Sequence, residues 1–101
     1  MFDRADDTRD RFVPIFSIHE SPLAYLIEAE IPGASTADVL VEAQGSDVVV
    51  RCARVLAGPD EGAFTRKLRL SHAIDGARLA AEVRDGVLRV RAPKLHAADE
   101  G

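Results

Sequence analysis

Apolar and polar residues alternate along most of this chain, and a period of two is typical of β-strands that bury one face. In Ala24–Ile31 (A-Y-L-I-E-A-E-I), every second residue from Tyr25 onward is apolar, whereas Glu28 and Glu30 fall on the opposite face. The pattern predicts seven short strands, at Ile15–Ile18, Ala24–Ile31, Asp38–Ala43, Val48–Ala53, Phe64–Leu70, Arg78–Arg84 and Val87–Ala92. Their spacing of about ten residues is typical of an antiparallel sandwich or barrel, so we expect an all-β fold.

Turn-forming residues separate these strands. Pro32-Gly33 ends the second strand, because proline lacks a backbone donor and glycine permits unusual φ angles. Val48–Ala53 is continuously apolar or β-branched apart from Arg51, which predicts a central strand, and Val55–Gly62 is predicted to be a loop. The strongest turn signal is Asp85-Gly86, since Asp-Gly between two alternating runs is typical of a tight hairpin with positive φ angles.

Composition limits the classes of function. The 101 residues are enough for one domain, and 47% of them are hydrophobic, which is enough for a real core. A net charge of -4 argues against a nucleic-acid partner, and no apolar run is long enough to span a bilayer. The start of the chain lacks the pattern of a signal peptide, and a single cysteine excludes an intramolecular disulfide. We therefore expect a cytoplasmic protein that binds neither nucleic acid nor membrane.

Residue types that carry chemistry are few and scattered. The three histidines, at positions 19, 72 and 96, lack metal-ligand spacing and are predicted to lie on the surface. Cys52 is interpreted as a small buried hydrophobic residue rather than a redox switch. Ser71, His72 and Asp75 are close in sequence, but proximity in sequence does not make a catalytic triad. Asp60-Glu61 is interpreted as a solvated acidic turn. We expect no enzyme activity, no cofactor and no metal.

The predicted hairpin also carries a family resemblance. Residues Ala81–Leu88 (A-E-V-R-D-G-V-L) match the signature A-x-x-x-[n/D]-G-V-L of the α-crystallin domain of small heat shock proteins. Further weak matches follow in the family's order, at Val13–Glu20 (where Ser17 and His19 replace the usual acidic and aromatic residues), Glu28–Gly33, Asp38–Val41, Phe64–Leu70 and Ala92–Lys94. Their order and spacing together make the chain resemble this family over roughly Val13–Lys94.

The resemblance implies an immunoglobulin-like antiparallel β-sandwich of about seven strands. It also implies an ATP-independent chaperone, a holdase that binds partly unfolded client proteins without a cofactor. On this basis residues 1–12 are a short charged arm, residues 13–94 form the α-crystallin domain, and residues 95–101 form a flexible tail. Two alternatives stay open. The same sandwich can serve as an adaptor or co-chaperone of the p23/CS type, or as a structural component of an assembly such as a coat or gas vesicle.

The chain departs from the family in features that govern assembly. The bacterial and plant branch exchanges a strand carried by a long loop, whereas an eight-residue loop at Val55–Gly62 would reach out only about 13 Å. The other branch pairs one edge strand with its copy, which here would be Ala63–Leu70. We therefore expect a homodimer through Ala63, Phe64, Arg66 and Leu68, with a monomer as the alternative. The charged arm and the lack of an I-x-I/V motif in the tail argue against large cages.

Arg66 has two alternative interpretations. It lies two residues from both Phe64 and Leu68, and so shares their face of the strand. The resemblance makes it an ion-pair residue of the dimer interface, whereas an arginine on an edge strand can also reach solvent through its long stem.

The resemblance further implies a groove for a client or a tail between the Asp38–Ala43 and Arg78–Arg84 strands. Its candidate residues are Val39, Val41, Ala81 and Val83, with plain sandwich core as the alternative reading for each of them.

Overall fold

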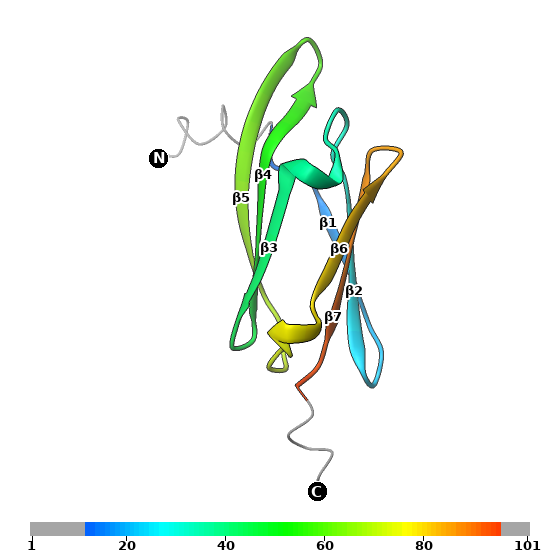
Figure 1. The fold of residues 1–101 in the computed structure, drawn as a ribbon, viewed down its shortest axis with the longest axis vertical. Coiled ribbons are helices and arrows are strands. Elements are labelled where there is room, and N and C mark those ends of the chain that lie inside the picture. The colour runs from blue at the N-terminus through cyan, green and yellow to red at the C-terminus, as the bar shows by residue number, and fades with distance from the viewer. Residues whose placement is uncertain (1–11, 96–101) are drawn as a thin grey trace, which may run out of the picture.

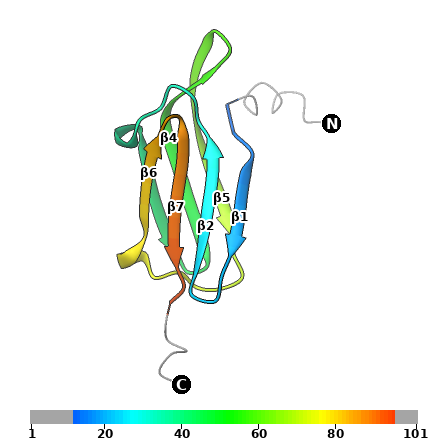
Figure 2. The same ribbon diagram turned by 90° about the vertical axis from the view of Figure 1, so that its right-hand side faces the viewer.

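Two antiparallel sheets packed face to face make up the computed structural model, which describes residues 12–95 (Figure 1). The seven strands are β1 (Phe16–Glu20), β2 (Ala24–Glu30), β3 (Val39–Gln44), β4 (Asp47–Ala57), β5 (Asp60–Arg69), β6 (Ala80–Arg84) and β7 (Val87–Pro93). One sheet has the order β1-β2-β7-β6 and the other β3-β4-β5; Figure 2 shows the four-stranded sheet in front. The predicted seven-stranded sandwich is confirmed. The predicted arm (apart from Phe12) and tail (apart from Leu95) lie outside the described residues.

The core lies between the sheets and follows the predicted alternation. Tyr25, Ile27 and Ala29 of β2 are buried, whereas Leu26 between them is 39% exposed. Ile27 pairs with Val90 of β7, and both side chains are fully buried. Within the described residues the core contains no buried charged side chain, so its stability comes from apolar burial and packing.

The β6–β7 hairpin turns as the sequence predicts. Asp85 and Gly86 both have positive φ angles, 53° and 76°, as a two-residue hairpin turn of type I′ requires. The carbonyl oxygen of Gly86 also accepts a hydrogen bond from the Ile31 backbone N–H at 2.7 Å. The turn is therefore tied to the corner that follows β2.

The prediction of a loop at Val55–Gly62 is wrong. β4 runs on to Ala57 and β5 begins at Asp60, so only Gly58-Pro59 separate them. The pairing shifts between Cys52↔Phe64 and Val55↔Gly62, which leaves one extra residue on β4. This bulge resets the alternation, so that Val55 points into the core and is 3% exposed.

The acidic pair Asp60-Glu61 is therefore part of β5 rather than a solvated turn. Glu61 lies 3.4 Å from the Arg54 guanidinium on the neighbouring strand. Smaller corrections concern strand starts: β1 begins at Phe16, and short 3₁₀ helices, η1 (Thr36–Asp38) and η2 (Gly76–Arg78), precede β3 and β6. Asp38 therefore belongs to η1 and Arg78 to η2, although the sequence pattern assigned both residues to strands.

Candidate functional site

The sandwich is open on the side where β3 and β6 form the edges of their sheets (Figure 1). Val39 and Val41 of β3 and Val83 of β6 are half-buried and pack against the core, while Ala81 is exposed. Ala81 and Val83 pair with Val90 and Leu88, which are fully buried, so both point toward the inside of the sandwich. The four predicted groove residues thus face inward on the two edge strands, and we call the seam between these strands the β3/β6 groove; its role in binding stays a prediction.

The two 3₁₀ helices bound this groove at opposite ends. At one end the Thr36 hydroxyl of η1 accepts a hydrogen bond from the Val83 N–H at 2.9 Å and lies 3.3 Å from the Val83 carbonyl oxygen. At the other end Gly76 of η2 lies close to Ala43, beside a hollow of about 480 Å³ that Val41 and Leu79 also line. Thr36 therefore occupies the backbone edge of β6 at Val83.

The opposite open side, between β1 and β5, holds most of the residues predicted for a dimer interface. Phe64 and Leu68 are 7% and 4% exposed, so they belong to the core of their own chain. The Phe16 and Phe64 rings pack edge to face with centres 6.2 Å apart, and the Arg66 guanidinium lies 5.5 Å from the centre of the Phe16 ring. Ala63 is exposed on the outer face.

Arg66 contacts the aromatic ring of Phe16. The sequence suggested instead that its side chain forms an ion pair at an interface or extends into solvent. Within residues 12–95 no carboxylate pairs with its guanidinium. A cation over an aromatic face is stabilising at the protein surface and keeps the charge accessible. Its role at an interface stays a prediction.

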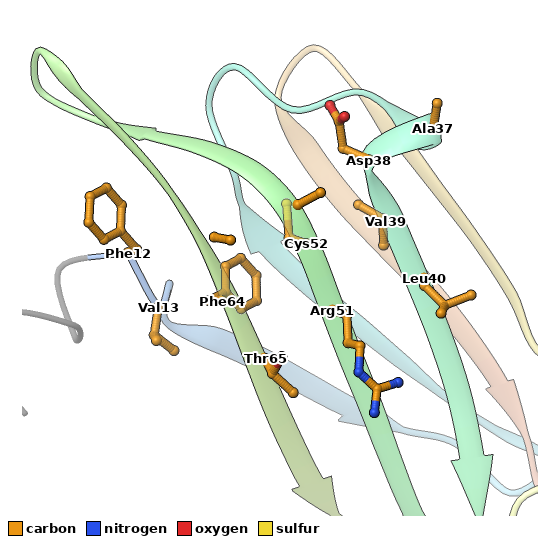
Figure 3. Close-up of a pocket in the computed structure, with 12 residues that line it drawn as sticks. Phe12, Val13, Ala37, Asp38, Val39, Leu40, Arg51, Cys52, Phe64 and Thr65 are labelled. Atoms are coloured by element: carbon orange, nitrogen blue, oxygen red, sulfur yellow. The ribbon is translucent and has the colours of Figure 1, made fainter.

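A second apolar hollow, of about 1120 Å³, lies near the bulge (Figure 3). Phe12 and Val13 line it from the side of β5 that faces away from β4, and Val39 and Leu40 line it from β3. The Phe12 ring packs so closely on Gly62 that a β-carbon there would lie 2.7 Å away. Sequence patterns did not reveal this contact, because residue 12 belonged to the predicted arm.

A polar network closes the end of the sandwich where β7 ends. Tyr25 is 3% exposed, and its hydroxyl lies 2.9 Å from His72 Nδ1 and accepts a hydrogen bond from the Ser71 N–H. Lys94 Nζ donates to Glu20 Oε2 at 2.6 Å, and this hydrogen bond holds the pKa of Glu20 below its usual value. The network ties the start of β2 to the loop after β5, and Lys94 to β1.

The arrangement offers no catalytic constellation among residues 12–95. His72 contacts Tyr25 instead of a nucleophile, and Asp75 accepts a hydrogen bond from the Ala77 N–H to begin η2. No group of three or more metal-ligating side chains occurs in this part of the chain. Burial raises the pKa of the Cys52 thiol, which is the opposite of what a redox-sensing thiolate needs.

Comparison with known proteins agrees with the geometry. Residues 17–100 match the model of the Hsp20/alpha crystallin family. Among curated proteins, spore protein SP21 of Stigmatella aurantiaca is 31% identical over 82% of this chain and 56% of its own length. The 21.9 kDa heat shock protein of Oryza sativa is 31% identical over 75% of this chain and 47% of its own. The chain spans about half the length of the curated relatives it matches.

Solved structures share the fold. Heat shock protein 16.0 of Schizosaccharomyces pombe superposes with a TM-score of 0.70 at 23% identity, covering 81% of this chain and 86% of that one. A small heat-shock protein of Xylella fastidiosa gives 0.69 at 24% identity, with coverages of 83% and 87%. Within the described range, no helix has the length and hydrophobicity to cross a membrane. The chain belongs to the Hsp20/alpha crystallin family of small heat shock proteins, whose members are chaperones.

Proposed function

We propose that this chain is an ATP-independent holdase that binds exposed apolar segments of partly unfolded proteins and limits their aggregation. The observation that carries the proposal is the β3/β6 groove, an apolar seam between two strands that each lie at the edge of their sheet. We further propose that it acts in the cytoplasm and catalyses no reaction.

The groove suits an extended apolar peptide rather than a folded ligand. Each square ångström of apolar surface removed from water contributes about 25 cal/mol, so a few buried side chains of a client supply appreciable affinity. A peptide lying along a free strand edge adds backbone hydrogen bonds to this burial. Neither interaction requires a nucleotide.

The charged outer faces support the same proposal. Arg89 Nε donates to Glu28 Oε2 at 2.8 Å on the outer face of one sheet, and Arg51 donates to Glu42 at 3.0 Å on the other. Such faces keep a protein soluble while its apolar groove is exposed. Client binding is therefore expected at the open sides of the sandwich rather than on its flat faces.

A homodimer through the β5 edge is the quaternary state that we propose, with a monomer as the alternative. The turn between β4 and β5 contains only Gly58-Pro59, which leaves no residues for an exchanged strand between them. β5 lies at the edge of its sheet and is ten residues long, enough for pairing with a second copy.

Size-exclusion chromatography with one client in two states tests the proposal. The client is added either native or after reductive unfolding, and co-migration with this protein is measured without ATP. The holdase proposal predicts co-migration of the unfolded form alone. Binding of a single native partner at fixed stoichiometry would support an adaptor, and growth into a mixed particle with native partners would support an assembly role.

A further inference from the structure

His72 lies between two side chains that favour opposite protonation states of its ring. Its Nδ1 atom is 2.9 Å from the Tyr25 hydroxyl oxygen and 3.5 Å from Glu20 Oε2. The Tyr25 oxygen already accepts a hydrogen bond from the Ser71 N–H, so the hydroxyl proton needs an acceptor of its own. A neutral ring with its proton on Nε2 supplies that acceptor at Nδ1, whereas a protonated ring offers Nδ1–H to the Glu20 carboxylate.

The charged and titratable groups that face His72 come from three other parts of the fold. Glu20 belongs to β1, Tyr25 belongs to β2, and Lys94 directly follows β7. Lys94 Nζ donates to the same Glu20 oxygen at 2.6 Å and lies 5.3 Å from the centre of the Tyr25 ring. The hydrogen bond from Lys94 holds the pKa of Glu20 below its usual 4.5, and the charge of His72 contributes to this effect. Glu20 is therefore charged over the range, about pH 5 to 8, in which imidazole groups ordinarily change charge.

The loop that carries His72 also holds the chain where it leaves the sandwich. Ile74, which is buried, pairs with Lys94 in an isolated antiparallel bridge. The Leu95 N–H donates to the Ala73 carbonyl oxygen at 2.8 Å. Ala73 and Leu95 are both exposed, so this hydrogen bond lies at the surface. A displacement of the His72 ring therefore acts one residue away from the contact that holds Leu95.

We propose that His72 is a pH-sensitive switch: on protonation its Nδ1 exchanges the Tyr25 hydroxyl for the Glu20 carboxylate, and the loop loosens its hold on Leu95. The proton comes from solvent, since the His72 side chain is 54% exposed. Nδ1–H and the Tyr25 hydroxyl proton are then two donors that face each other, so their contact breaks. The carboxylate gains a charge-assisted hydrogen bond in its place. The switch lies at the end of the sandwich where β7 ends, and it operates without client binding.

His19 provides a matched comparison within the chain. Its Nε2 lies 4.0 Å from Glu28 Oε1, and its side chain is 65% exposed. Among residues 12–95 no hydroxyl group forms a hydrogen bond with its ring. His19 thus has a neighbouring carboxylate, as His72 has, but no second partner that favours the neutral ring.

An NMR titration of the full chain tests the exchange of partners. Glu20→Gln removes the partner of the protonated ring, so the midpoint of the His72 ring signals should fall by about half a pH unit or more. Tyr25→Phe removes the partner of the neutral ring, so this midpoint should rise by a similar amount. The midpoint of the His19 signals should change in neither variant. A His72 midpoint that Glu20→Gln leaves unchanged, or that moves in the same direction in both variants, would overturn the switch.

Nitrogen-15 relaxation at pH 5 and pH 7.5 measures the effect on the chain where it leaves the sandwich. The order parameter of the Leu95 amide should fall at pH 5 from a rigid value of about 0.85 toward about 0.6. The Ile31 amide, which donates to Gly86 at the opposite end of β7, should not change.

Replacing the exposed histidines separates the switch from a general effect of pH. His72→Gln should make the order parameter of Leu95 independent of pH, because glutamine does not titrate. His19→Gln should keep the full pH dependence. A Leu95 amide that is equally ordered at both pH values in the wild type, or a pH dependence that persists in His72→Gln, would overturn the proposal.

Discussion

Gly33 lies so close to Leu56 that a β-carbon at residue 33 would stand 2.5 Å from Leu56 Cγ. The Leu56 N–H also donates to the Pro32 carbonyl oxygen at 2.8 Å, and Gly33 has a φ angle of +87°. The Pro32-Gly33 corner that ends β2 is therefore the point where the far end of β4 docks on the other sheet. A residue without a side chain is needed there for both space and backbone angle.

Replacing Gly33 by alanine should destabilise the fold by about 2 kcal/mol or more, because strain at positive φ adds to a clash with Leu56. Urea denaturation measures the loss. Gly45→Ala is the matched control, since Gly45 also has a positive φ of 62° but has no atom within 4 Å of the added carbon. The control should lose only about 1 kcal/mol, and equal losses at the two positions would show that the contact with Leu56 contributes nothing.

Replacing Gly86 by valine should destabilise the β6–β7 hairpin by about 1 kcal/mol or more, because a β-branched residue is strained at a φ of 76°. Gly86→Asn is the control, since asparagine tolerates positive φ and the added carbon would meet Pro32 only at an ordinary 3.7 Å. In thermal denaturation, the melting temperature should be highest for the wild type, lower for Gly86→Asn and lowest for Gly86→Val. An unchanged melting temperature for the valine variant would contradict the assigned turn.

Lys94 should stabilise the fold in a pH-dependent way through Glu20. Its hydrogen bond lowers the pKa of Glu20 from the usual 4.5, so the stabilisation is present above pH 4.5 and is lost as the pH falls through the lowered pKa. The loss of stability in Lys94→Met, by urea denaturation, should therefore be larger at pH 7 than at pH 3. Methionine keeps an unbranched apolar side chain at this position but lacks the ammonium, which lies 5.3 Å from the centre of the Tyr25 ring.

Lys67→Met is the control for this pH effect, because Lys67 Nζ lies 4.0 Å from the nearest carboxylate oxygen of Asp47, a much looser pair. The effect of Lys67→Met on the free energy of unfolding should change less between pH 3 and pH 7. A loss in Lys94→Met that is the same at pH 3 and pH 7 would mean that the ion pair with Glu20 does not contribute to folding.

Two adjacent alanines of β6 test the β3/β6 groove. Ala81 pairs with the buried Val90 and faces the groove, whereas Ala80 pairs with Arg91 and faces outward. Both are exposed, so Ala81→Asp and Ala80→Asp should both fold. We expect Ala81→Asp to weaken client binding severalfold by burying a charge against an apolar segment, and Ala80→Asp to leave it unchanged. Equal client affinities, measured by fluorescence anisotropy of a labelled unfolded client, would rule out the groove as the binding site.

Local patterns predicted the parts of the fold that local chemistry determines. The alternation of Tyr25 and Ile27 with Leu26 identified the buried face of β2, and Asp85-Gly86 identified a two-residue hairpin whose φ angles are both positive. The groove residues came from the family resemblance, and the structure shows that Val39, Val41 and Val83 are half-buried and pack against the core. The alternation of apolar residues could not distinguish a groove residue from a core residue, because either role requires an apolar side chain on the inward face of the strand.

Features that depend on distant residues were not predictable. The bulge after Cys52 moves Val55 to the inside of the sandwich, and nothing in the local alternation marks where one extra residue is accommodated. The Tyr25–His72 contact joins residues 47 positions apart, so His72 was interpreted only as a surface histidine. Phe12 packs under Gly62, although it follows a charged segment with no apolar period.

Light scattering of a heat-labile client, heated with and without this protein and without ATP, tests the central claim most directly. Ratios should run from substoichiometric to excess, with the folded state of the protein checked by circular dichroism at the assay temperature. The holdase account predicts that scattering falls progressively as the ratio rises and that added ATP changes nothing. Undiminished scattering in the presence of excess folded protein would contradict it.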